Sequence, residues 1–149
     1  MADDRPLPIR TEQRAGKRLE GAVRGHRIVT DRPPNEGGDD AGPTSGELLL
    51  LSIGSCAAGA LRNYLNAAGI ATQRVAVEVG FEPNPVHERR DRIRIRACVP
   101  PEAMHLGAAA LREAALSGGV TSRMRAGSEV EVDIAPGSAQ VAIDGKATT

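Results

Sequence analysis

Aromatic residues and excess charge are both scarce in this 149-residue chain. It has no tryptophan, and its only aromatic side chains are those of Tyr64 and Phe81. That leaves little for stacking on nucleic-acid bases. The 19 basic residues balance the 19 acidic ones, so the formal net charge is zero. Without an excess of basic side chains there is no electrostatic case for a nucleic-acid or an anionic-membrane partner.

Cysteine and long apolar segments are limited too. The chain has two cysteines, and its first 18 residues, MADDRPLPIRTEQRAGKR, contain no apolar run of the kind found in a secretory signal. We therefore expect a cytoplasmic protein without a structural disulfide. The longest charge-free run, Leu48–Leu61, has 14 residues. A bilayer span needs about 20, so this run is expected inside a protein.

Residue clusters that would hold a metal or a cofactor are absent from the sequence. The three histidines, His26, His87 and His105, are scattered, and none is paired with another ligand at the usual spacing. The Gly37–Asp40 segment lacks both the strand–turn–helix context and the lysine of a phosphate-binding loop. We expect neither a metal nor a cofactor.

The apolar run belongs to a helix with clear start and stop signals. Thr44 and Glu47 fit a capping box, in which each side chain bonds the backbone N–H of the other residue. The helix is expected to continue to about Ala68, with Gly69 as its stop. Small residues such as Gly54 and Ala57 allow other elements to approach it closely.

The other elements are expected from alternation and from turn residues. Apolar residues alternate in the predicted strands, and a second helix is expected to follow Pro100. The predicted order is β-β-α-β-β-α-β, an α+β domain with antiparallel sheets. The strands are expected at 17–23, 26–30 (after a bend at Gly25), 75–81, 93–99 and 130–134, with a weaker one at 139–143 and the second helix at 101–116.

Three further segments are distinguished by composition. Residues 1–16 are expected to form a flexible arm, residues 17–144 a single domain, and residues 145–149 a polar tail. The segment Asp31–Gly42 is expected to be a loop, and connections of this length are often functional.

Cys56 allows two interpretations. It lies 12 residues after the expected cap, about 18 Å along the helix, beyond the reach of the helix dipole. A buried apolar site would keep it a thiol. A reactive thiolate would need a cation from a loop or from a partner subunit. The residues alone leave both a structural and a reactive cysteine open.

Cys98 also has two interpretations. It alternates with Arg94 and Arg96, which could favour a thiolate. However, Glu129, Glu131 and Asp133 alternate in the same way with opposite charge. The simpler hypothesis is that these two strands are neighbours and pair Arg with Glu, with Cys98 a bystander.

The segment from His26 to Cys56 contains four motifs that occur together: Asp31-Arg-Pro33, Gly37-Gly38-Asp39, Gly42-Pro43-Thr44 and the Glu47-Leu-Leu-Leu-Leu-Ser-Ile-Gly-Ser-Cys56 helix. With these motifs the segment resembles the OsmC/Ohr superfamily of osmotically inducible and organic-hydroperoxide-resistance proteins. The resemblance covers about residues 17–135. It implies an intertwined homodimer with the cysteine helices at its centre, and a thiol peroxidase that reduces organic hydroperoxides. Cys56 matches the position of the peroxidatic cysteine.

Three departures from the family pattern bear on activity. Gly118 stands where the resolving cysteine is expected, and Cys98 does not match that cysteine. Gly46 stands where a glutamate would help to hold the activating arginine, with Glu47 one residue later. In the hydroperoxide-resistance branch of the family the activating arginine comes from the N-terminal region, where Arg24 and Arg27 of this chain are candidates. The resemblance also implies a site-lining or loop-fixing role for His26.

Two functions therefore follow from the resemblance. One is a one-cysteine peroxidase, in which Cys56 attacks a hydroperoxide, Arg24 or Arg27 stabilises the thiolate, and an external thiol is the reductant. His26 and Glu47 would contribute to binding. The other is a catalytically degenerate dimer that binds a small apolar ligand at the subunit interface.

Overall fold

The computed structural model describes residues 9–71, 75–86 and 91–132. These residues form two compact units, which are treated separately. The first unit includes the described residues up to Glu47, together with Glu131 and Val132, and the second runs from Leu48 to Val130. The architecture is α+β with antiparallel sheets, as predicted.

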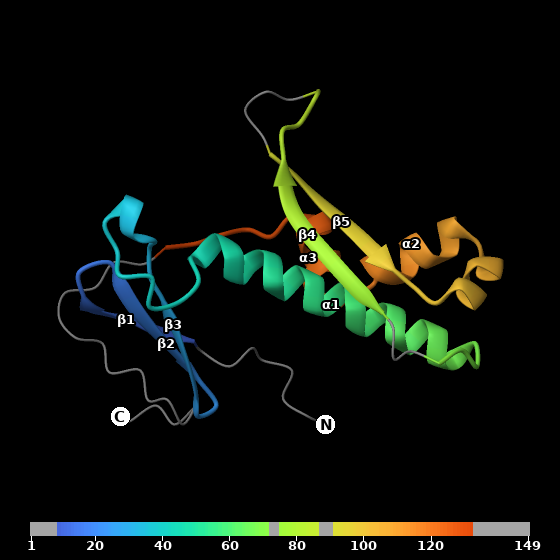
Figure 1. Ribbon diagram of the computed structural model, residues 1–149, viewed down its shortest axis with the longest axis horizontal. Coiled ribbons are helices and arrows are strands. Elements are labelled where there is room, and N and C mark those ends of the chain that lie inside the picture. Colours follow the sequence, from blue (N-terminus) through green and yellow to red (C-terminus); the bar gives the residue numbers. More distant parts are fainter. Residues whose placement is uncertain (1–8, 72–74, 87–90, 133–149) are drawn as a thin grey trace. The chain divides into compact units, whose positions relative to one another are not determined.

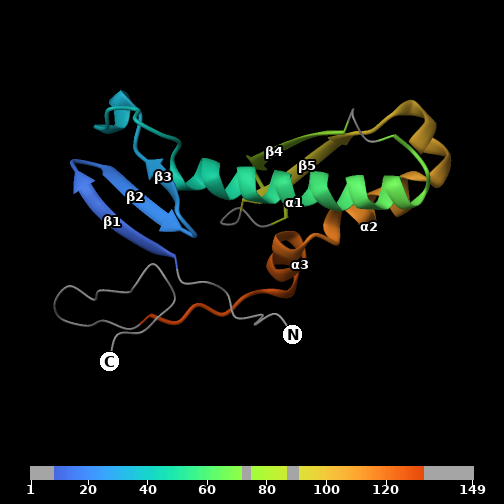
Figure 2. The same ribbon diagram turned by 90° about the horizontal axis from the view of Figure 1, so that it is seen from below.

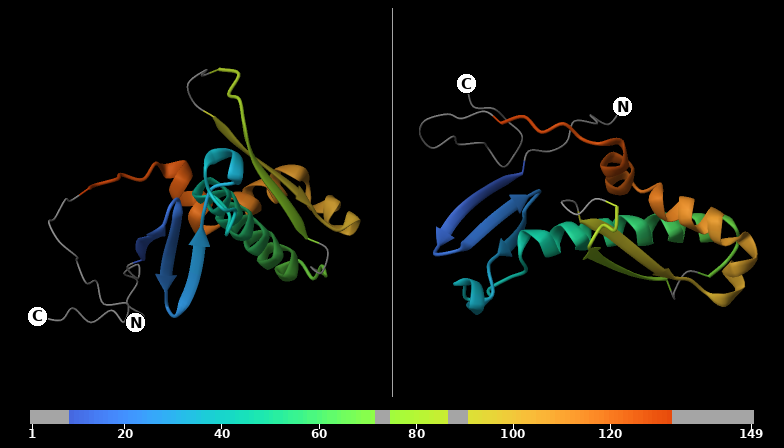
Figure 3. Two further views of the ribbon diagram at one scale, coloured as in Figure 1. Left: turned by 60° about the vertical axis from the view of Figure 1, so that its left-hand side comes forward. Right: turned by 90° about the horizontal axis from the view of Figure 1, so that it is seen from above.

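The first unit contains a three-stranded antiparallel sheet in the order β1-β2-β3 (Figure 1; the blue strands of Figure 3). Its strands are β1 (Arg10–Ala15), β2 (Arg18–Val23) and β3 (His26–Thr30). The predicted bend is a two-residue hairpin loop with Arg24 at φ 48° and Gly25 at φ 80°. Two positive φ values are the signature of a type I′ turn, whose twist matches that of the strands it joins.

Strand β1 corrects one prediction. Residues 1–16 are predicted to form a flexible arm, but Arg10–Ala15 pair with β2. The segment RTEQRA has little apolar character, so its signal as a strand was weak. It is held by the backbone ladder and by ion pairs such as Arg14 to Glu20, with N and O 3.0 Å apart.

A loop closed by one buried carboxylate follows β3. Asp31 is 3% exposed and accepts hydrogen bonds from the backbone N–H groups of Arg32, Asp39 and Ala41 at 2.8, 3.1 and 3.2 Å. These bonds, led by the one from Arg32, lower the pKa of Asp31. The loop contains a short 3-10 helix, η1 (Pro34–Glu36).

Helix α1 (Ser45–Ala67) has the predicted start and stop. The Thr44 N–H donates to the Glu47 carboxylate at 2.7 Å, and the Glu47 N–H donates to the Thr44 hydroxyl at 3.3 Å. At the other end, Gly69 has φ 74°, and the Gly69 and Ile70 N–H groups donate to the carbonyls of Asn66 and Leu65. This is the Schellman arrangement, and Ile70 and Leu65 are both in the core.

Strands β4 (Ala76–Glu82) and β5 (Arg92–Cys98) form an antiparallel ladder beside α1 in the second unit (Figure 2). A Cβ on Gly54 would lie 3.2 Å from Cγ2 of Val79, so β4 passes close over the helix at this glycine. The core of the unit combines buried α1 residues with side chains from α2, η2 and the strands. Its fully buried members include Ala57, Leu61, Leu65 and Ala103.

The arginines of β5 pair with glutamates as predicted, but the glutamates belong to β4 and not to the predicted segment at 129–133. Glu78 and Glu82 of β4 lie opposite Arg96 and Arg92, and Glu82 binds the Arg92 and Arg94 guanidinium groups at 3.0 Å. The predicted partners, Glu129 and Glu131, lie in a segment without strand structure, and Asp133 lies outside the described residues.

The C-terminal part of the second unit is more helical than predicted. The expected helix 101–116 is divided at Gly107, which has φ 87°, into η2 (Pro101–Leu106) and α2 (Ala108–Leu116). The pair Gly118-Gly119 ends α2 as predicted, but a third helix, α3 (Gly119–Ala126), begins at once. The strand expected at 130–134 is absent from described residues 130–132, and 134 and 139–143 lie outside the described residues.

Candidate functional site around Cys56

The side chains of α1 that are buried by the rest of the chain form one narrow stripe along the helix. The buried residues Ile53, Ala57, Leu61 and Leu65 recur every fourth position. By contrast, Leu49 is 41% exposed and Leu51 is 64% exposed. The expectation that the helix is buried all round is therefore not met within a single chain. By length and composition α1 could also span a membrane, a test that core helices of soluble proteins pass as well.

Cys56 lies beside the covered stripe and is partly exposed. It lines an open pocket of about 490 Å³ between α1 and the junction of α2 with α3. Both cysteines are free thiols. None of the described lining residues is charged. They are Ser55, Cys56, Gly59, Ala60, Asn63, Tyr64, Ala114, Ser117, Gly118 and Gly119.

Gly118 is in direct contact with Cys56. A Cβ on Gly118 would lie 2.9 Å from the Cys56 carbonyl oxygen and 3.1 Å from the Cys56 Cβ. Disulfide-bonded cysteines have Cβ atoms about 3.5–4.5 Å apart. Position 118 thus adjoins the Cys56 side chain, but it carries no side chain of its own.

Four polar side chains line the pocket, and two of them, Asn63 and Tyr64, are site residues that the sequence did not identify. The other two, the Ser55 and Ser117 hydroxyls, donate to the carbonyls of Leu51 and Ala114. Asn63 and Tyr64 have no such partner among the described residues and remain available to a ligand. Their spacing was the signal, because positions seven and eight residues after Cys56 lie on the same face of a helix.

The N-terminal candidates lie in the first unit, and Cys56 lies in the second. Arg27 is paired with Glu20 at 2.6 Å. Arg24, in the hairpin loop, is exposed and makes no ion pair or hydrogen bond with a described residue. His26 is exposed at the start of β3, opposite Val23.

Glu47 and Cys98 have clear local roles. The Glu47 carboxylate accepts from the N–H and the hydroxyl of Thr44, and the N–H bond is the main cause that lowers the pKa of Glu47. Cys98 is exposed at the end of β5, opposite Ala76, and does not line the Cys56 pocket. No cluster of His, Cys, Asp and Glu suited to a metal occurs among the described residues.

Comparisons with known proteins agree on the fold. Residues 37–135 match the family model for OsmC-like protein. No curated protein sequence matches the chain. Three solved structures, all at low sequence identity, superpose over most of their length.

The first is described as an osmotic stress induced and detoxification response protein from Psychrobacter arcticus. It has 14% identity and a TM-score of 0.60, with 82% of this chain and 90% of that chain covered. An organic hydroperoxide resistance protein OsmC from Legionella pneumophila has 16% identity, a TM-score of 0.59 and the same coverage. An organic hydroperoxide resistance protein from Vibrio cholerae, with captopril in one active site, has 15% identity and a TM-score of 0.57, covering 84% and 89%.

Proposed function

The chain belongs to the OsmC-like family, and from that premise we propose that it is a thiol-dependent peroxidase with Cys56 as its one reactive cysteine. The observation that carries the proposal is that Cys56 lines an open pocket whose wall includes Gly118. The thiol has access to a substrate, and no protein thiol occupies the neighbouring position. Two of the similar structures are named as hydroperoxide-resistance proteins.

The reaction has two stages. The Cys56 thiolate attacks one oxygen of the hydroperoxide O–O bond, which breaks to give a sulfenic acid on Cys56 and, after protonation, the alcohol. An external thiol then attacks the sulfenic sulfur, releases water and forms a mixed disulfide. A second external thiol releases the Cys56 thiol and leaves as the oxidised disulfide.

The external thiol has a place to approach. Cys56 lines the open pocket, and position 118 beside it carries no side chain that could shield the thiol. Cys98 lies on β5 and outside the pocket lining, so it is not the proposed resolving thiol. The polar side chains of Asn63 and Tyr64 are available to hydrogen-bond either substrate.

Arg24 is the better candidate for the activating cation. A thiolate needs a nearby positive charge, and no charged residue is among the described residues that line the pocket. Arg27 already neutralises Glu20, whereas Arg24 has no such partner among the described residues. The proposed roles of His26 and Glu47 are secondary, because the Glu47 carboxylate serves the helix cap.

We also propose that the protein is a cytoplasmic homodimer. The exposed leucines of α1, Leu49 and Leu51, lie two residues apart and therefore on opposite sides of the helix, so α1 presents apolar surface on more than one side that a second copy could cover. Two free thiols fit a reducing compartment. Sedimentation equilibrium of wild type and Leu51→Glu tests the assembly, since the variant should shift towards monomer.

The activity is tested with cumene hydroperoxide and a monothiol reductant. Wild type and Cys98→Ser should turn over at similar rates, while Cys56→Ser should lose at least 100-fold, the scale on which a nucleophile contributes to catalysis. Dimedone should trap a sulfenic acid on Cys56 when the reductant is absent. Turnover that survives Cys56→Ser would refute the proposal.

The second candidate function is binding of a small apolar ligand by a catalytically degenerate dimer. It is favoured by the uncharged lining of the Cys56 pocket. The pH dependence of alkylation separates the two. A thiol that titrates near or above about 8.5, the value of a free cysteine, favours binding, and a midpoint below about 7 favours the peroxidase.

A further inference from the structure

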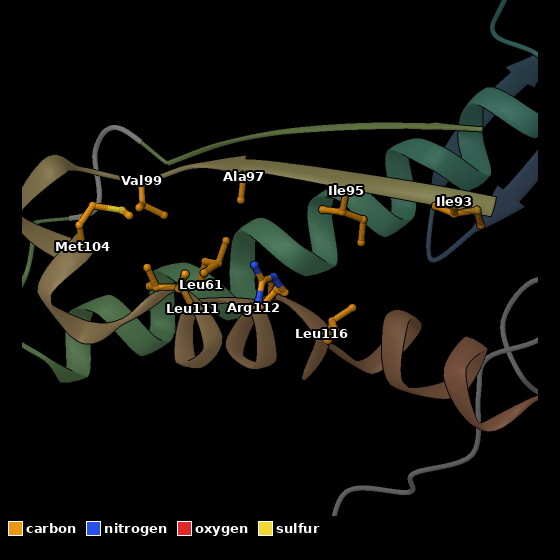
Figure 4. A pocket seen from close by; sticks show the side chains of 11 residues that line it. Leu61, Ile93, Ile95, Ala97, Val99, Met104, Leu111, Arg112 and Leu116 are labelled. Atoms are coloured by element: carbon orange, nitrogen blue, oxygen red, sulfur yellow. The ribbon is translucent and has the colours of Figure 1, made fainter. Parts of the chain in front are cut away.

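A second cavity lies entirely within the second unit, between the inner face of β5 and helix α2. Its volume is about 410 Å³, within the roughly 300–1,000 Å³ of small-molecule sites. Figure 4 shows Ile93, Ile95, Ala97 and Val99 of β5 along one side, facing Leu61 and α2. The cavity shares no lining residue with the Cys56 pocket.

Arg112 is the charged member of this otherwise apolar lining among the described residues. Figure 4 shows its guanidinium among the apolar side chains of the cavity. It makes no ion pair or hydrogen bond with any described residue. The adjacent carboxylate, Glu113, is paired instead with Arg125 at 3.6 Å. The cavity therefore combines an apolar wall with one uncompensated positive charge.

We propose that this cavity binds a small carboxylate with an aliphatic tail. A guanidinium presents parallel N–H donors that match the two oxygens of a carboxylate. The β5 side chains and Leu61 offer an aliphatic tail a surface without hydrogen-bonding groups. A ligand rich in hydroxyl groups would lose hydrogen bonds to water against the same wall.

Charge complementarity selects this occupant over an apolar segment of a second copy. An apolar segment that covered the cavity would remove water from Arg112 without supplying an anion. Burial of an unpaired charge is strongly unfavourable. Arg112 is exposed, so water solvates its guanidinium when the cavity holds no ligand. An occupant with an anionic group as well as an apolar part compensates this charge, which an apolar segment does not.

The test is isothermal titration calorimetry with decanoate, below its micelle concentration, against 1-decanol as the uncharged match. Wild type should bind decanoate at least tenfold more tightly than 1-decanol. From octanoate to decanoate the affinity should rise about tenfold, the value of two buried methylenes. Arg112→Gln should weaken decanoate binding at least tenfold and leave 1-decanol binding within twofold.

Three variants serve as controls. Arg96→Gln removes a cation that does not line the cavity and should bind decanoate as wild type does. Ala97→Leu adds volume inside the cavity and should weaken both ligands, with unchanged circular dichroism as the check on folding. Cys56→Ser should bind decanoate as wild type does, so the result of the binding test does not depend on whether the protein is a peroxidase.

Two results would overturn the inference. One is equal affinity of wild type for decanoate and 1-decanol, or of wild type and Arg112→Gln for decanoate. The other is no decanoate binding at all, together with an Ile93→Glu variant that converts dimers to monomers in sedimentation. That second result would show that another copy of the chain covers the cavity.

Discussion

A cysteine introduced at Gly118 should form a disulfide with Cys56 and change the stability of the protein in two opposite ways. In the reduced variant, the new Cβ would lie 2.9 Å from the Cys56 carbonyl oxygen and 3.1 Å from the Cys56 Cβ. Overpacking of this kind costs about 1–3 kcal/mol. We therefore expect reduced Gly118→Cys to be less stable than wild type by about that amount.

Oxidation should reverse the loss. The disulfide needs a Cβ separation of about 3.8 Å, so the two backbones must move apart by about 0.7 Å from the present 3.1 Å. A crosslink between positions 56 and 118 closes a loop of roughly 60 residues, which stabilises by about 4 kcal/mol in the chain-entropy model. After the geometric strain is subtracted, the free energy of unfolding of the oxidised variant should exceed that of the reduced variant by about 2–4 kcal/mol.

The measurement is urea unfolding of Gly118→Cys with and without a phosphine reductant, combined with titration of free thiols after diamide treatment. The variant should fall from three free thiols to one. The control, Ser122→Cys, adds a thiol on α3 outside the pocket and should keep all three. Three free thiols in treated Gly118→Cys, with no difference in unfolding midpoint, would refute the placement of Gly118 against Cys56.

Three further predictions concern stability. Thr44→Ala should lower the free energy of unfolding by about 1 kcal/mol through loss of the helix cap, while Thr44→Ser should stay near wild type; equal urea midpoints for all three proteins would contradict the capping role. Leu65→Ala, at a fully buried site, should cost about 3–4 kcal/mol by urea unfolding, whereas a loss below 1 kcal/mol would show that this core is loosely packed. Folding lowers the pKa of Asp31, so the ionised Asp31 contributes its full stabilisation of the folded state above about pH 3.9, the pKa of a free Asp, and loses it as the pH falls through the lowered pKa. The Tm of Asp31→Asn should therefore drop less between pH 5 and pH 2 than the Tm of wild type. Parallel Tm profiles of the two proteins would contradict this prediction.

The elements that sequence analysis predicted well are those with strong local signals. Helix α1 has a cap and a glycine stop that act within a few residues, and both are confirmed. Turn residues at the ends of a strand, or apolar residues that alternate along it, predicted strands β2, β3, β4 and β5. The OsmC-like fold is confirmed as well, because the loop and helix that carry the resemblance are local motifs.

The wrong predictions concern elements whose structure depends on non-local contacts or whose sequence pattern is weak. Strand β1 has a mostly polar sequence and depends on pairing with β2. Helix α3 begins inside a glycine pair that indicates a break, with Gly118 as its N-cap and Gly119 as its first residue. The arginines of β5 pair with Glu82 of β4 and not with the predicted Glu129 or Glu131, and this partner becomes evident only from the strand pairing.

The candidate site divides in the same way. The sequence supplies Cys56 and the absence of a cysteine at 118, and the contact between these positions required the structure. Asn63 and Tyr64 could have been found from helical spacing. Arg112 could not be identified from the sequence, because a single exposed arginine in the run AAALREAAL resembles any other surface arginine, and only the structure shows that it lines a cavity.

The loop closed by Asp31 has a consequence for how this protein can vary. A Cβ on Gly38 would lie 2.0 Å from the Arg32 carbonyl oxygen, and one on Gly42 would lie 2.2 Å from that of Val29. Selection should therefore act on the buried Asp31 and on the two glycines, while an exposed charged residue of the loop such as Glu36 can vary. In a saturation library scored by folding, positions 31, 38 and 42 should reject nearly all replacements, and position 36 should accept most.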